Sequence, residues 1–192
     1  MKHSFLIQTA VSTLIVLSAA SAIEAAEPDT SAAAAYCEQE GGKVISRVPT
    51  YGTNGPESSW LYLTGPRDFC QFTSSTDGSR IHVLLQTLYA TTPTLAALAY
   101  YAKVAPGQGG PGNPASYYCT QLGGSDLFGG VNAAGGGWVG KGSPDAVLEA
   151  CIFPDMSSID SWGLFYNSAS IVRGINLTGV LRYAPPSGAA KK

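Results

Sequence analysis

The residues that could perform acid–base or nucleophilic chemistry are few and lie close together in the chain. His82 is the only histidine after His3, and Ser74, Asp77 and Ser79 precede it closely. A histidine beside a carboxylate and a hydroxyl is the set that hydrolases use to activate a nucleophile. Serines are frequent in this chain, however, so a surface or capping role for His82 is the stronger interpretation. A weak hydrolase around His82 stays a minor alternative, and no catalytic residue is assigned.

Acidic residues offer no better catalytic pair. Asp77 recurs as Asp155 in a second Asp-x-Ser context, which is typical of a turn or a helix cap. Glycoside hydrolysis needs two carboxylates, and no second acid recurs beside these two. The cysteines lack the neighbouring histidines of a metal site, so neither a metal nor a cofactor is expected.

The cysteines belong to an internal repeat. The segment 36–42, Tyr-Cys-Glu-Gln-Glu-Gly-Gly, returns 82 residues later at 118–124 as Tyr-Cys-Thr-Gln-Leu-Gly-Gly. Cys70-Gln71-Phe72 likewise returns as Cys151-Ile152-Phe153. Because these matches keep their order and nearly constant spacing, the sequence indicates a duplicated unit.

The repeat also predicts how the cysteines pair. Each copy contains two cysteines, so copies that fold around their own cores would join Cys37 to Cys70 and Cys119 to Cys151. A loop of this size contributes about 3–4 kcal/mol by restricting the unfolded chain. Structural staples are therefore the expected role of all four cysteines.

The first residues indicate export. Lys2 precedes an apolar run over residues 5–20, and the small residues 20–22 follow it. These features predict a signal peptide over residues 1–22, with a retained membrane anchor as the alternative. The first cysteine is Cys37, so there is no lipobox, and the expected location is the periplasm or the exterior.

Composition excludes several classes of partner. The formal net charge is −2, and only 12% of residues are charged. Such a chain lacks the basic footprint that nucleic acid or an anionic membrane surface would attract. Membrane contact is accordingly not favoured.

Local patterns predict the elements of each copy. Helices are expected from Asp29-Thr30-Ser31 to Glu40, and after the cap Asn113 with Pro114 at the first helical position. Strands are expected at 44–48, 60–63, 69–73 and 151–153. Helical spacing of apolar residues predicts further helices around 81–88, 94–101 and 159–166.

The expected fold class is α+β, with two tandem modules that each contain a helix, a small antiparallel sheet, a second helix and one disulfide. The expected boundaries are residues 29–105 and 113–184, separated by a Gly/Pro linker at 106–112 and followed by a disordered tail at 185–192.

Copy two resembles the DUF333 family of small exported bacterial domains. The resemblance rests on Asn113–Gly124, Cys151–Asp155 and Ile159–Trp162. Met156 replaces the glycine that is usual in the family, and Ile159 stands where a third cysteine often occurs. Copy one carries a degenerate version of the pattern. The resemblance implies an exported α+β domain, and a frequent hemolysin label for the family suggests a membrane-active protein as an alternative function.

The leading functional hypothesis is a non-enzymatic exported binding or inhibitory module. Its partner would be another protein or a component of the cell envelope. The candidate contacts are Trp138, Trp60 and Trp162 because exposed aromatic rings commonly anchor interfaces. Trp138 is the first choice, since it lies between glycine tracts that predict a flexible hairpin with little to bury the ring.

Overall fold

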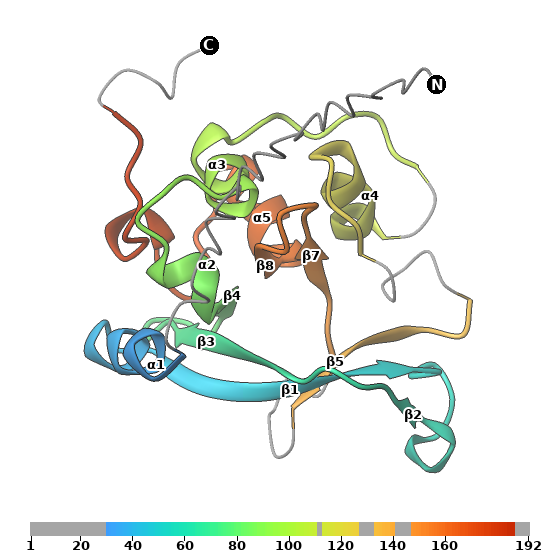
Figure 1. Cartoon of the computed structure of the whole chain (residues 1–192). Coiled ribbons are helices and arrows are strands. Elements are labelled where there is room, and N and C mark those ends of the chain that lie inside the picture. The colour runs from blue at the N-terminus through green and yellow to red at the C-terminus, as the bar shows by residue number, and fades with distance from the viewer. Residues whose placement is uncertain (1–29, 111–112, 127–132, 141–146, 187–192) are drawn as a thin grey trace, which may run out of the picture.

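Both copies of the repeat contribute strands to one antiparallel sheet (Figure 1). The structure is a computed structural model, and the residues it describes are 30–110, 113–126, 133–140 and 147–186. The expected combination of helices with an antiparallel sheet is confirmed. The expected arrangement as two separate tandem modules is not what these residues form.

The elements follow the order of the repeat. Copy one contains α1 (Thr30–Gln39), β1 (Lys43–Tyr51), β2 (Leu61–Tyr62), β3 (Arg67–Thr73), β4 (Arg80–Leu84), α2 (Leu85–Tyr89) and α3 (Leu95–Ala102), with a 3-10 turn at Glu57–Ser59. Copy two contains α4 (Pro114–Gln121), β5 (Gly136–Gly140), β6 (Val147–Leu148), β7 (Ala150–Ile152), β8 (Ser158–Asp160) and α5 (Ser161–Ser168), with a 3-10 turn at Leu177–Gly179.

The glycine pairs that follow α1 and α4 have two distinct roles. The first glycine of each pair ends its helix in the left-handed region, with φ +82° at Gly41 and +84° at Gly123. The second lies against a disulfide, because a Cβ at Gly42 would be 2.3 Å from the Cys70 sulfur. At Gly124 the corresponding distance to the Cys151 sulfur is 2.4 Å. The repeated Gly-Gly therefore stops the helix and makes room for the disulfide.

The disulfides join Cys37 to Cys70 and Cys119 to Cys151, the pairing that the repeat predicts. All four residues are fully buried. Each bond connects the last turn of a helix, α1 or α4, to a strand of the sheet, β3 or β7. The covalent link therefore fixes one helix of each copy on the sheet.

The strand order interleaves the two copies. The sheet runs β6-β5-β1-β3-β4-β8-β7, with β2 paired to β1. Val83 of β4 pairs with Ile159 of β8, which joins the copies at the centre. At the other end, β5 of copy two lies antiparallel to β1 of copy one along five residue pairs. Hydrogen bonds between strands thus connect the copies twice, so neither copy has a sheet of its own.

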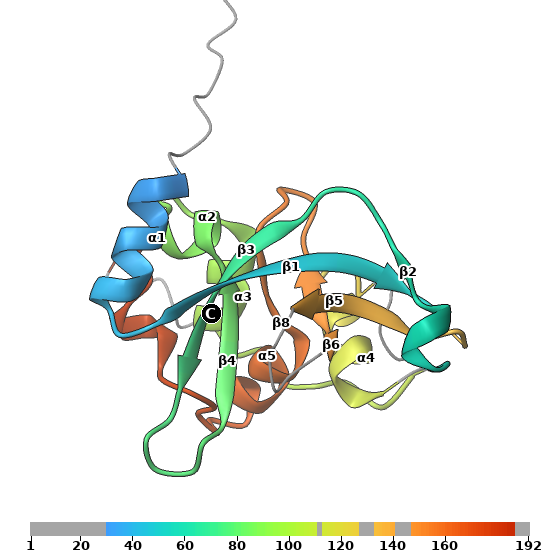
Figure 2. The same ribbon diagram turned by 90° about the horizontal axis from the view of Figure 1, so that it is seen from below.

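The two ends of the sheet are close in the chain. Only Glu149 separates β6, which pairs with β5, from β7, which pairs with β8. The sheet must therefore curl so that its first and last strands meet at this residue. Figure 2 shows β1 beside β5, and β2 projecting with its connecting turn at one end of the sheet.

The copies also exchange their C-terminal segments. The hydroxyl of Tyr36 in copy one donates to the carbonyl of Val180 in copy two, at 2.8 Å. The equivalent Tyr118 of copy two donates to the carbonyl of Val104 in copy one, at 2.6 Å. Each copy thus binds the C-terminal segment of the other copy.

A second pair of contacts follows the same exchange. The Ser157 hydroxyl accepts from the Ala96 amide of α3, and the equivalent Ser79 hydroxyl accepts from the Gly174 amide, both at 3.0 Å. Because equivalent residues make reciprocal contacts, an approximate twofold axis relates the copies. The pairing of Val83 with Ile159 places this axis between β4 and β8.

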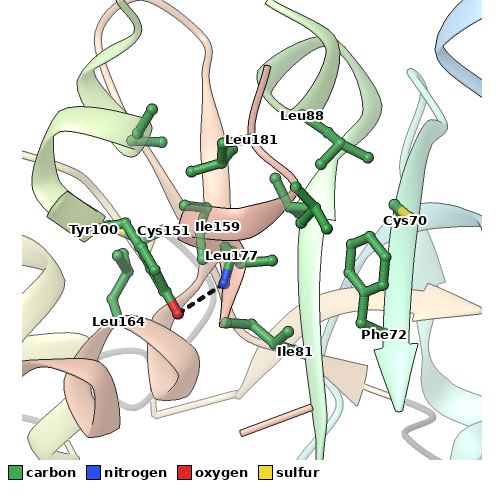
Figure 3. Packing of buried hydrophobic residues seen from close by; sticks show 14 of the residues in the cluster. Cys70, Phe72, Ile81, Leu88, Tyr100, Cys151, Ile159, Leu164, Leu177 and Leu181 are labelled. Carbon is green, nitrogen blue, oxygen red and sulfur yellow. Dashed lines mark hydrogen bonds between the residues drawn. The ribbon is translucent and has the colours of Figure 1, made fainter. Parts of the chain in front are cut away.

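A shared core follows from this exchange (Figure 3). The main cluster of buried apolar side chains contains Ile81, Leu88 and Tyr100 of copy one beside Ile159 and Leu177 of copy two. The hydroxyl of Tyr100 accepts from the Leu177 amide at 3.2 Å. The expectation that each copy folds around its own core is therefore wrong.

Two elements differ from the expected secondary structure. Residues 80–84 and 158–160 form strands β4 and β8, where helical spacing predicted helices around 81–88 and 159–166. The helices α2 and α5 begin only at Leu85 and Ser161. In both places the helix begins at the residue after the strand ends. The apolar residues of the strand and of the helix together therefore gave the spacing of a single helix. Among the described residues, no helix has the length and apolarity needed to cross a membrane.

Candidate functional site

A cluster of polar side chains lies buried where the copies meet. The His82 amide donates to Oδ2 of Asp160 at 2.6 Å, and the ring nitrogen Nδ1 lies 3.6 Å from the same oxygen. The other ring nitrogen, Nε2, is 3.0 Å from Oε1 of Gln71 and 3.2 Å from Nη2 of Arg47. Arg47 also donates to the carbonyl of Trp138 at 3.0 Å. Strands of both copies therefore meet through this cluster.

Groups of both kinds surround the His82 ring. The Arg47 guanidinium, which can only donate, and Oε1 of Gln71, which can only accept, both lie at Nε2. Nδ1 faces Asp160. Oδ1 of Asp160 accepts in turn from the Gly163 amide in the first turn of α5. Asp160 thus links β4 to the start of α5.

The residues of this cluster are almost completely shielded from solvent. The exposed fractions are 0% for Arg47, 3% for His82 and 4% for Asp160. The expected surface or capping role for His82 is therefore wrong. The serines near it in sequence are engaged elsewhere, since Ser74 and Ser79 bond to the turn around Asp77. The cluster joins the copies, and the geometry lends no support to a hydrolase there.

The three tryptophans are placed separately. Trp138 lies within β5, half-buried, with its ring 5.7 Å edge-on from that of Phe69. The Arg67 guanidinium lies 5.9 Å from the Trp138 ring centroid. The expectation of a ring with little to bury it is wrong, because strand pairing brings these neighbours from copy one. The segments 127–132 and 141–146 around β5 lie outside the described residues.

The other two rings are also half-buried. Trp60 donates from its indole nitrogen to the carbonyl of Gly55 at 3.0 Å, which closes the turn before β2. Trp162 lies in α5, with its ring 6.0 Å from that of Phe165 and 5.8 Å from that of Tyr166. The structure does not bring the three tryptophans together into one surface.

The most exposed apolar segment lies instead beside Trp60. Leu61, Tyr62 and Leu63 expose 60%, 56% and 41% of their surfaces. Tyr51, the partner of Leu61 across the β1–β2 pair, is also exposed. We call residues 60–63 with Tyr51 the β2 patch. Sequence reasoning identified this strand but not its exposure. A signal was present, because residues 60–63 do not alternate between polar and apolar side chains and an apolar side chain must therefore point outward.

The β2 patch also has a free backbone edge. Leu63 donates its amide to the carbonyl of Pro49 on β1, at 2.8 Å. Alternation along a strand therefore turns the amide and carbonyl of Tyr62 away from β1. Among the described residues, β1 is the only strand that pairs with β2. Such an edge offers hydrogen bonds to an added strand.

Away from the β2 patch, the described residues line a larger and a smaller hollow. The larger has a volume of about 520 Å³ and lies between the start of β3, the start of α2 and the turn at 155–157. The smaller, of about 270 Å³, has a largely apolar lining that includes Tyr117 and Phe165 together with Pro106, Gly107, Gly109 and Gly110 of the expected linker.

The turn at 155–157 caps a helix of the other copy. Oδ2 of Asp155 accepts from the Leu95 amide at the start of α3, and Oδ1 accepts from the amide and hydroxyl of Ser157. Partial burial would raise the pKa of Asp155, but these hydrogen bonds from Ser157 and Leu95 outweigh it and hold the pKa below its usual value.

Replacing Asp155 with alanine should lower the free energy of unfolding at pH 7 by about 0.5–1 kcal/mol, because α3 loses a cap from an exposed carboxylate. A depressed folded-state pKa contributes stability above the unfolded value, near pH 4, and this contribution is lost as the pH falls through the folded value. Urea unfolding at pH 7 and at about pH 2.5 should therefore show a gap between variant and wild type that narrows in acid. An equal gap at both values would contradict this role.

Comparisons with protein-family models, with curated proteins and with solved structures find no match to this chain. The resemblance of copy two to the DUF333 family therefore stays a prediction. The two disulfides indicate an oxidising extracellular or periplasmic environment.

Proposed function

We propose that this is an exported binding module that holds a protein partner through the β2 patch. The observation that carries the proposal is the combination of exposed apolar side chains with a free strand edge at residues 61–63. A partner would add an extended segment beside β2, as in other cases of strand addition. Export rests on the predicted signal peptide, together with the oxidising environment that the disulfides indicate.

Rigid support favours this surface over the other exposed apolar residues. The Trp60 indole fixes the turn before β2, and Asn54 donates to the carbonyl of Ala133, at 3.1 Å, on the side of β5. The Gly52 amide also donates to the carbonyl of Gly135 at 3.1 Å. Both copies thus hold the projecting turn, and a preformed surface loses less entropy when it binds.

Proline at position 62 tests strand addition directly. Tyr62→Pro removes the outward amide of β2 without removing a hydrogen bond to β1, so the fold should survive while an added strand loses its donor. We expect the affinity for the partner to fall by about tenfold or more, which corresponds to about 1.4 kcal/mol. Partners captured from an extract by the wild-type protein would be measured quantitatively against the variant.

Ile171→Asp provides the matched control, because Ile171 is 51% exposed and lies on another part of the surface. This variant should capture the same partner as the wild type. Circular dichroism of both variants would show that each retains the fold. Equal loss of capture in both, or full capture by Tyr62→Pro, would contradict the proposal.

A further inference from the structure

The larger hollow lies apart from the β2 patch and is built by both copies. Copy one supplies Arg67 and Asp68 at the start of β3, together with Leu84, Gln86 and Thr87 at the junction of β4 with α2. Copy two supplies the turn Asp155–Ser157. The volume of about 520 Å³ is within the range of pockets that hold small ligands.

Gln86, a residue that lines this hollow, has an unsatisfied acceptor. Oε1 of Gln86 is shielded from solvent and has no hydrogen-bond partner among the described residues. A buried carbonyl oxygen without a donor costs free energy, so such atoms are rare in folded proteins. Turned into the hollow by a rotation of the Gln86 side chain, this oxygen would accept from a hydroxyl or amine of a ligand, which would remove this cost.

Other groups in the wall include both donors and acceptors. The Thr87 hydroxyl accepts from the Ser158 amide, and the Thr94 hydroxyl accepts from the Ala97 amide. Each therefore keeps its own hydrogen to donate. Arg67 adds a guanidinium donor, whereas Asp68 and Asp155 add carboxylate acceptors.

The balance of these groups selects the class of ligand. Two carboxylates against one guanidinium make the wall mildly negative, which disfavours an anionic ligand. A simple ammonium can donate but cannot accept from the threonine hydroxyls or from Arg67. Hydroxyl groups do both, so a neutral molecule with several hydroxyls matches the wall best.

We propose that this hollow is a binding site for a neutral polyhydroxylated ligand, such as a sugar, with Gln86 as the buried acceptor that orients it. The apolar edges of a sugar ring would lie against Pro66, Leu84 and Met156, which also line the hollow. The site is independent of the β2 patch, so either proposal can fail without the other.

The test titrates three sugars of equal size into the full exported chain and follows the amide resonances of Asp68 and Thr87. Glucose is neutral, glucosamine carries an ammonium group and glucuronate carries a carboxylate. We expect glucose and glucosamine to shift these resonances with dissociation constants of about 1–10 mM, and glucuronate to bind about tenfold more weakly. Maltotriose would then distinguish a free sugar from the end of a longer glycan.

Gln86→Met supplies a second measurement that does not need a ligand. Methionine has nearly the same shape but no acceptor, so the unliganded variant should melt about 2–4 °C above the wild type while its sugar binding falls by about tenfold. Gln39→Ala, at an exposed glutamine on α1, should change neither value. The proposal is overturned if glucose shifts nothing at about 50 mM, if glucosamine alone binds, or if Gln86→Met binds as the wild type does.

Discussion

Replacing Cys37 and Cys70 together with alanine is expected to lower the free energy of unfolding by about 3–4 kcal/mol, the constraint of one closed loop of this size. Although this disulfide belongs to copy one, both copies should lose their structure together. The reason is that β5 of copy two pairs with β1, and β8 pairs with β4. Copy two therefore has no complete sheet once copy one unfolds.

Differential scanning calorimetry measures this directly. One transition at a lower temperature, with equal calorimetric and van't Hoff enthalpies, is the expected result. The matched variant lacks Cys119 and Cys151, whose loop differs by one residue, with separations of 32 and 33. It should show a loss of similar size. Two transitions, one of them unmoved by the substitutions, would show that the copies unfold independently.

Replacing Asp160 with alanine should also cost about 3–5 kcal/mol, because a buried polar network loses its central acceptor. Asp160 receives the His82 amide, faces the His82 ring and caps α5 through the Gly163 amide. Alanine would remove the acceptor that these groups share. Unfolding in urea, followed by circular dichroism, measures the loss as a lower midpoint with an unchanged slope.

Asp77→Ala is the control for this prediction. Asp77 occupies the Asp-x-Ser turn of copy one and accepts from the amide and hydroxyl of Ser79, but it is exposed. Its loss should have a much smaller effect than the loss of Asp160. Similar midpoints for the two variants would mean that the buried cluster adds no stability beyond that of a surface turn.

Features that depend on neighbouring residues could be predicted from the sequence. The cap Asn113 accepts from the Ser116 amide as expected, and Pro114 occupies the first helical position. The strands at 44–48 and 69–73 are confirmed as parts of β1 and β3. In each case the chemistry that fixes the element lies within a few residues of it.

Pairing between distant segments could not be predicted in the same way. The strand β4 lies between β3 and β8, and no local pattern records its partner in the other copy. Glycine caused the error at Trp138, since the same residue type serves turns and close packing. A Cβ at Gly137 would lie 2.6 Å from the Val147 side chain, so this glycine permits strand pairing rather than flexibility. The candidate surface at residues 61–63 was missed because exposure depends on where the sheet ends.

The axis between β4 and β8 has a consequence for the duplication itself. His82 and Asp160 occupy equivalent positions of the repeat, and their backbone and side chains face each other across that axis. In a symmetric pair of identical chains this position would face itself, imidazole against imidazole or carboxylate against carboxylate. Joining two copies in one polypeptide frees each half to carry a different residue there. Two different residues can therefore complement each other at this position, which is impossible in a symmetric homodimer.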